Sequence, residues 1–165
     1  MPEYDLEGQT LGEYEVRARL ALGSMSTVYE AYQHALDRLV ALRVLNPKLA
    51  ENPQYVKAFR HEAALLARLE HPHILPIHSY GQEHGYNYMA LRLMRGGSLK
   101  DKVGSSGGLP LPECSTLTRQ MASALDFVHQ QGLVNGELSR ANILFDGWGN
   151  PYIGNLFFAG LTASE

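Results

Sequence analysis

The stretch that decides the fold of this chain reads Leu133-Val134-Asn135-Gly136-Glu137-Leu138-Ser139-Arg140-Ala141-Asn142-Ile143-Leu144. It begins just after a predicted helix and ends in apolar residues, so we expect a loop that leads into a short strand. Asn135, Glu137 and Asn142 are its candidate chemical groups, since a carboxylate can accept a proton and both carboxylate and amide oxygens can bind cations. What they can do depends on the elements on either side.

The bulk composition is typical of a soluble globular domain. The 165 residues are enough for one domain with a core, and the hydrophobic and charged contents of 45% and 19% are ordinary. A net charge of −3 argues against binding to nucleic acid or anionic lipid. Met1–Thr10 is no signal peptide, and no apolar run predicts direct membrane insertion. The single cysteine, Cys114, fits a cytoplasmic setting, in which a partner could still attach the chain to a membrane-bound complex.

Five segments predict strands, the first from weak alternation, and an amphipathic helix is expected between the third and the fourth. The strands are Glu13–Leu20, Val28–Tyr32, Leu39–Leu45, Ile74–Ser79 and Tyr86–Leu93. The helix is expected to start at Pro53 after the cap Asn52 and to run to about Glu70.

The second half of the chain is predominantly helical. Gly96-Gly97-Ser98 opens a short helix, and Gly104–Gly108 is typical of a flexible link. A long helix is predicted from Pro112 to about Gln131, followed by short strands around a turn at Asp146–Asn150. Strands followed by helices make an α+β pattern.

Glu62 is the first residue in the predicted helices that needs a partner. It shares one helical face with Phe59, Ala63 and Leu66, so it points towards a core, where a lone carboxylate is costly. Arg43, inside an apolar strand, is the candidate cation. The alternative is a glutamate at the rim of a slightly rotated helix.

The order of these features resembles a bacterial Ser/Thr protein kinase of the eukaryotic-like type, from about Leu11 to Leu161. Four segments carry the resemblance, in the order and spacing of the family: Val40-Ala41-Leu42-Arg43, Phe59-Arg60-His61-Glu62, His71-Pro72-His73-Ile74-Leu75-Pro76 and Arg95-Gly96-Gly97-Ser98-Leu99. The resemblance implies a small lobe at 11–95, with a five-stranded antiparallel sheet and one helix, after an N-terminal extension at 1–10. It also implies that 96–165 is the first part of a helical large lobe whose remainder is absent.

The resemblance also marks what has changed in the glycine loop and on the lysine strand. The glycine loop keeps Gly23, while Ala21 and Ser26 occupy the first and third glycine positions, where side chains obstruct a phosphate. Arg43 stands where the family has a lysine. Arginine can still pair with Glu62, but its planar fork does not replace a lysine on the phosphates.

The opening stretch aligns with the family's His-Arg-Asp loop, and its chemistry has changed as well. Glu137 stands at the position of the catalytic Asp, Ser139 at that of a lysine, and Asn155 at that of the magnesium-binding Asp. Asn142 is retained, but one neutral amide is a poor Mg²⁺ site, so no metal is expected. These losses predict a pseudokinase without catalytic residues.

A vestigial nucleotide cleft is implied by the same resemblance. Its residues would be Gly23, Val28, Ala41, Arg43, Leu91, Leu93 and Leu144. Apolar walls could hold a purine weakly, so we expect no cofactor beyond weak ATP binding. The functional alternatives are a regulator that senses ATP without hydrolysing it and, third, an unconventional active kinase that uses Glu137 and Asn142.

A protein partner, or a second copy of the chain, is expected on the large-lobe part. The predicted contact residues are Leu117, Met121, Leu125 and Val128 on the long helix, and Phe157 and Phe158 in the tail. The alternative is that the tail folds back over the helix. The His71-Pro72-His73 segment is expected to be a turn and not a zinc site. Trp148 is expected to cover the small strand pair, although it could be a surface anchor.

Overall fold

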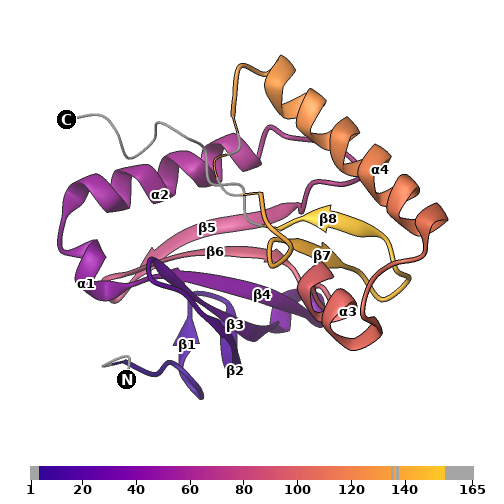
Figure 1. Cartoon of the computed structure of the whole chain (residues 1–165). Coiled ribbons are helices and arrows are strands. Elements are labelled where there is room, and N and C mark those ends of the chain that lie inside the picture. The colour runs from indigo at the N-terminus through magenta and orange to yellow at the C-terminus, as the bar shows by residue number, and fades with distance from the viewer. Residues whose placement is uncertain (1–3, 135, 137, 155–165) are drawn as a thin grey trace. The chain divides into compact units, whose positions relative to one another are not determined.

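The computed structural model describes residues 4–134, 136 and 138–154, which form parts of two compact units (Figure 1). The first unit contains Met1–Ala63 and Ile77–Leu93, and the second contains Ala64–Pro76 and Met94–Glu165. Residues 64–76 therefore group with the second unit, although the resemblance implied one boundary near residue 95. Each unit is described by itself below.

The first unit is built on an antiparallel sheet of six strands in the order β1-β2-β3-β4-β6-β5. Its strands are β1 (Thr10–Leu11), β2 (Tyr14–Leu22), β3 (Ser26–Gln33), β4 (Arg38–Leu45), β5 (Ile77–Glu83) and β6 (Tyr86–Arg92). The predicted number of five was wrong by one, because the two-residue β1 pairs with the start of β2. The predicted strand at Ile74–Ser79 lies further along the chain, since Ile74 instead forms a bridge with Ile153 in the second unit.

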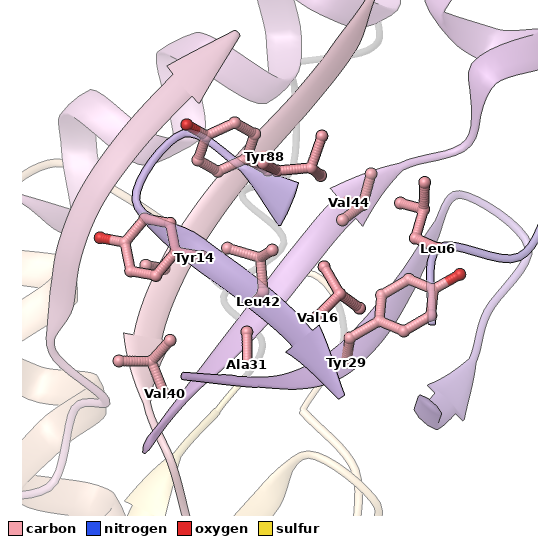
Figure 2. Packing of buried hydrophobic residues seen from close by; sticks show 11 residues of the cluster. Leu6, Tyr14, Val16, Tyr29, Ala31, Val40, Leu42, Val44 and Tyr88 are labelled. Carbon is pink, nitrogen blue, oxygen red and sulfur yellow. The ribbon is translucent and has the colours of Figure 1, made fainter. Parts of the chain in front are cut away.

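The main core of the first unit lies on one face of this sheet (Figure 2). Burial alternates along β3, as the period-two geometry of a strand requires. The buried cluster consists of Leu6, Leu11, Tyr14, Val16, Tyr29, Ala31, Val40, Leu42, Val44, Tyr88 and Ala90. Leu6 lies in the segment expected to be an extension, yet its exposure is 0%. The N-terminal residues therefore contribute directly to this core.

Two short helical segments and one longer helix complete the first unit's chain. They are η1 (His34–Leu36), α1 (Pro47–Ala50) and α2 (Pro53–Leu66), whose last residues pass into the second unit. The start of α2 at Pro53 is as predicted, but the helix ends four residues before Glu70. The amides of Arg68 and Leu69 bond to carbonyls three residues back, which is the tightening expected where a helix ends.

The second unit contains α3 (Leu99–Ser106), α4 (Leu111–Gln130) and a pair of short strands, β7 (Ile143–Phe145) and β8 (Pro151–Ile153). Ser98 and Asp101 form a reciprocal capping box that starts α3. The predicted flexible link at Gly104–Gly108 was wrong in its first half, because α3 continues through Ser106 and ends only at Gly107, with φ 72°.

The apolar stripe of α4 is covered more than predicted. Met121 and Val128 are buried, and Leu117 and Leu125 are half-buried. The helix packs along β8, which supplies part of the cover. The expectation that all four side chains form an open partner surface is therefore wrong for Met121 and Val128. Phe157 and Phe158 lie outside the described residues.

The helices were also compared with the requirements of a membrane span. Within the described ranges, none combines the length and the apolar character needed to cross a bilayer.

Candidate functional site

A buried ion pair joins β4 to α2 in the first unit. The Nη1 atom of Arg43 donates a hydrogen bond to Oε1 of Glu62 at 2.8 Å, and the two side chains are 10% and 7% exposed. Residues 40–44 pair with both β3 and β6, which holds Arg43 in the middle of the sheet. The pair expected from the helical position of Glu62 is therefore present, and the alternative of a glutamate at the rim is wrong.

Arg43 makes two further contacts. Its Nε donates to Oγ of Ser26 at 3.0 Å, and its guanidinium carbon lies 5.5 Å from the centre of the Phe59 ring. Ser26 is the residue at the third glycine position of the predicted glycine loop. The arginine is thus engaged by side chains from β3 and α2, which draws two of its nitrogen atoms into internal bonds.

The strand register places the first unit's predicted nucleotide residues on one face of the sheet. Val28 pairs with Arg43, and Ala41 pairs with Leu91. Because neighbouring residues on a strand point to opposite faces, this face is the one opposite Val40, Leu42 and Val44 of the main core. Ala41 and Leu91 are buried, whereas Val28 and Leu93 are half-buried. The predicted nucleotide residues of this unit are therefore apolar side chains together with one cation, Arg43.

Gly23 closes the turn between β2 and β3. Its amide donates to the carbonyl of Ser26 at 2.9 Å, and a Cβ at this position would lie 2.8 Å from the same oxygen. A side chain at residue 23 would therefore push against backbone that cannot easily move. The shape of the turn is a sufficient reason for this glycine without any phosphate.

The retained residues of the opening stretch belong to the second unit. The carbonyl of Asn142 accepts a hydrogen bond from the amide of Gly154 at 2.7 Å, and Leu144 of β7 pairs with Tyr152 of β8. A Cβ on Gly154 would lie 2.5 Å from Cδ1 of Leu144, so the chain approaches β7 very closely there. Asn135, Glu137 and Asn155 lie outside the described residues.

Gly96 and Gly97 explain the motif that precedes α3. Two backbone hydrogen bonds join these glycines to Phe145. The amide of Gly96 donates to the carbonyl of Phe145 at 2.8 Å, and the amide of Phe145 donates to the carbonyl of Gly97 at 2.9 Å. A Cβ on Gly96 would lie 2.5 Å from the carbonyl oxygen of Asp146. The glycines allow two backbone segments to lie in direct contact.

Asp146 was missed as an important residue, although its place in the predicted turn was a usable signal. It is buried, and its carboxylate accepts hydrogen bonds from the amides of Trp148 and Asn150 and from the Asn150 side chain. This network holds the turn that presents Trp148, which is 87% exposed. The expectation that Trp148 covers the strand pair is therefore wrong.

The remaining candidate groups are the cysteine and the possible metal ligands. Cys114 is exposed, and no group of three or more His, Cys, Asp or Glu side chains within the described ranges is arranged to hold a metal ion.

An antiparallel sheet whose central strand is joined to a helix by a buried cation–glutamate pair, followed by a helical unit with a small strand pair, defines a protein-kinase-like fold. Residues 14–160 match the protein kinase domain family, to which this chain belongs.

Curated relatives are bacterial Ser/Thr kinases. The chain is 32% identical over 159 residues to serine/threonine-protein kinase PknE of Mycobacterium tuberculosis, which covers 96% of this chain and 28% of the relative. It is 34% identical over 137 residues to PknD of the same species, covering 83% of this chain and 21% of the relative. The chain therefore spans less than a third of the length of these relatives.

The fold is also similar to a solved structure, the PknI kinase domain of Mycobacterium tuberculosis. The TM-score is 0.79 at 28% identity, and the match covers 93% of this chain and 62% of the PknI chain. The protein-kinase-like fold expected from the sequence is confirmed for the part that the two chains share.

Proposed function

We propose that this chain is a catalytically inactive protein-kinase-like module that acts by binding a protein partner. The observation that carries the proposal is the hydrogen bond from Nε of Arg43 to Ser26, which adds to the pairing with a helix glutamate that the family's lysine also makes. In the family a lysine at this position serves the phosphates of ATP. Here the cation at that position is bound to its own sheet and helix.

Phosphoryl transfer depends on positioning and on neutralising phosphate charge. The other replacements therefore reduce the expected catalytic activity further. Ser139 and Asn155 stand where the family has a lysine and a metal-binding aspartate, and Glu137 stands in place of the catalytic aspartate. The ion pair in the first unit and the backbone contacts of Gly96 and Gly97 in the second unit are both formed. Preserved packing with altered chemistry favours a binding role.

Transfer of label from γ-labelled ATP tests the inactivity directly. We expect no incorporation into the chain itself or into a general protein substrate above that of the Glu137→Ala variant. Label transfer by the unaltered chain that Glu137→Ala abolishes would instead favour the unconventional kinase. A refolded PknE kinase domain, assayed alongside, would establish that the conditions permit transfer.

The partner surface that we propose lies on the second unit and differs from the stripe predicted from sequence. Leu111 and Trp148 are 83% and 87% exposed, whereas Met121 and Val128 are buried. Their neighbours Pro112 and Gly149 line a groove of about 330 Å³. Tryptophan is among the residues that most often dominate the energy of protein contacts, and exposed apolar side chains that lie together mark interaction sites. A homo-oligomer would use the same surface and is detected by light scattering.

A cytoplasmic setting is part of this proposal, supported by the single exposed Cys114.

A nucleotide-sensing regulator is the second candidate, favoured by the apolar wall of Val28, Ala41 and Leu91 in the first unit. A ligand that binds only the folded state raises the melting temperature by mass action. Titration with ATP, with and without Mg²⁺, therefore separates the two candidates. A saturable rise in melting temperature favours sensing, and no rise at about millimolar ATP removes it.

A further inference from the structure

The groove beside Leu111 and Trp148 belongs to the second unit, where α3, α4 and the turn between β7 and β8 supply most of its lining. Its apolar lining residues are Leu109, Pro112, Leu117, Phe145 and Pro151. Phe145 and Pro151 are buried and Leu117 is half-buried, so the apolar base of the groove is fixed by packing. The volume of about 330 Å³ lies at the lower end of the range of about 300–1,000 Å³ for ligand pockets, so the groove suits a few side chains.

The charged side chains of the groove neutralise each other. Among the lining residues, all of which lie in the described part of the chain, Lys102 and Glu113 are the only charged ones. Nζ of Lys102 lies 3.6 Å from Oε1 of Glu113 and 4.4 Å from the centre of the Phe145 ring. The lining therefore has no net charge to attract a phosphate or a strongly charged segment. Electrostatic complementarity favours an uncharged occupant.

The uncharged polar side chains of the lining differ in whether their hydrogen bonds are already made. The hydroxyl of Thr116 donates to the carbonyl of Pro112 at 3.1 Å, and Nδ2 of Asn150 donates to the Asp146 carboxylate at 3.0 Å. Gln120 is half-buried, and its side chain makes no hydrogen bond to any other described residue. A side-chain amide both donates and accepts, as a backbone peptide unit does. Gln120 can therefore bind the backbone of a peptide in the groove.

The exposed apolar surface continues beyond the groove on two elements. Leu111, 83% exposed, precedes the lining residue Pro112 at the start of α4, and Trp148, 87% exposed, precedes the lining residue Gly149 after β7. A small molecule confined to the groove would leave both side chains in water. A segment of extended chain passes through a groove and also covers side chains outside it, so this arrangement favours a peptide over a small molecule.

We propose that the groove binds an uncharged, extended peptide segment of a protein partner, an inference that rests on the partner-binding role proposed above. One or two large apolar side chains of the segment would pack against Leu117 and Phe145, and one of its backbone peptide units would bond to the Gln120 amide. Leu111 and Trp148 would contact the parts of the segment that lie outside the groove.

Selection of short random peptides displayed on phage against the full 165-residue chain tests the chemistry of the occupant. The selected peptides are expected to be uncharged and to carry large apolar residues. Because Trp148 is the only tryptophan of the chain, each synthesised peptide should also produce a saturable change in its fluorescence. Enrichment of charged peptides, or of none, would overturn the proposal, as would peptides that bind without a change in Trp148 emission.

Two matched variants on α4 test the position of the peptide. Thr116 and Thr118 are both exposed and both donate to the carbonyl four residues back, but only Thr116 lines the groove. Thr116→Phe should fill the groove and weaken peptide binding by about tenfold or more, whereas Thr118→Phe should leave it unchanged. Equal binding by the Thr116→Phe variant, folded as judged by circular dichroism, would place the peptide elsewhere and overturn the proposal.

Gln120→Leu tests the backbone contact and decides the question if Thr116→Phe does not fold. It should weaken peptide binding by about twofold to tenfold, the effect of about one hydrogen bond, and unchanged affinity would overturn the proposal. The proposed function can fail separately. A co-purifying partner that is lost with Trp148→Ala but kept with Thr116→Phe would overturn the groove as the site and leave the binding role intact. Label transfer from ATP by a chain that binds the peptides would overturn the proposed inactivity and leave the groove as the site.

Discussion

The two units keep their family-specific features by different physical means. In the first unit, the side chains of Arg43 and Glu62 carry opposite charges and form a buried ion pair. In the second unit, Gly96 and Gly97 lie against Phe145 and Asp146 through backbone groups, with no side chain between them. The first arrangement depends on which side chains are present, and the second depends on a side chain being absent. The two should therefore fail under different substitutions.

The largest effect is expected from Glu62→Ala, which would leave the Arg43 guanidinium buried without its counter-charge. We expect a loss of about 3–5 kcal/mol in the free energy of unfolding, measured by urea denaturation. The double variant Arg43→Met with Glu62→Leu should recover most of this loss, because no charge then remains buried.

The matched control lies in the second unit, where Lys102 and Glu113 form an exposed pair at 3.6 Å. Glu113→Ala should cost less than about 1 kcal/mol, since water screens this pair. Similar losses for Glu62→Ala and Glu113→Ala would contradict the view that the first unit depends on a buried charge pair.

Gly96→Ala is expected to have the next largest effect. The added methyl would lie 2.5 Å from the Asp146 carbonyl oxygen and 2.8 Å from Phe145, so backbone would have to shift, at about 1–3 kcal/mol. Gly104→Ala is the control, because nothing lies within 4 Å of its added methyl inside α3. This variant should gain about 0.5–1 kcal/mol from higher helix propensity. A measured loss in both variants would argue against close backbone approach as the cause.

Ser98→Ala should have a smaller effect, because it removes one half of the capping box at the start of α3. Ser98 accepts from the Asp101 amide, so its loss should cost about 1 kcal/mol in thermal or urea unfolding. The Asp101 pKa, lowered chiefly by its hydrogen bonds to Ser98, should rise towards its ordinary value in this variant. An unchanged Asp101 titration measured by NMR would mean that these bonds do not form in solution.

Trp148→Ala is expected to affect folding least. The side chain is 87% exposed, so the free energy of unfolding should change by less than about 0.5 kcal/mol. Recovery of a co-purifying partner, or of a homo-oligomer in light scattering, should nevertheless fall sharply if the second unit's exposed apolar surface is the contact. The control Leu36→Ala removes a side chain from the first unit that is 60% exposed. An equal effect of both variants on recovery would place the contact elsewhere.

Local sequence patterns predicted most of the fold because their causes are local. The apolar strand at Leu39–Leu45 and the Pro53 start of α2 appear in the structure close to their predicted positions. The pairing of Glu62 with Arg43 also followed from helical spacing and the cost of a lone buried charge. The position of the fourth predicted strand did not follow, because Ile74 has an apolar side chain that suits either the sheet or its actual partner, Ile153.

The sequence predicted which residues stand at the candidate site but not all the contacts that they make. The replacement of the family lysine by Arg43 is visible in the sequence, whereas its bond to Ser26 depends on the register between β3 and β4. The burial of Met121 and Val128 likewise depends on which elements pack against α4, which helical periodicity does not specify.

By itself, the sequence determined the order of strands and helices, the membership of the protein kinase domain family and the substitutions at its functional positions. These rest on spacing and residue type, which are properties of short segments. Only the tertiary structure decided that Leu6 belongs to the core, that Trp148 is exposed and that His71 must accept a hydrogen bond. Those outcomes depend on contacts between segments far apart in the chain, whose energies are set by packing and not by local pattern.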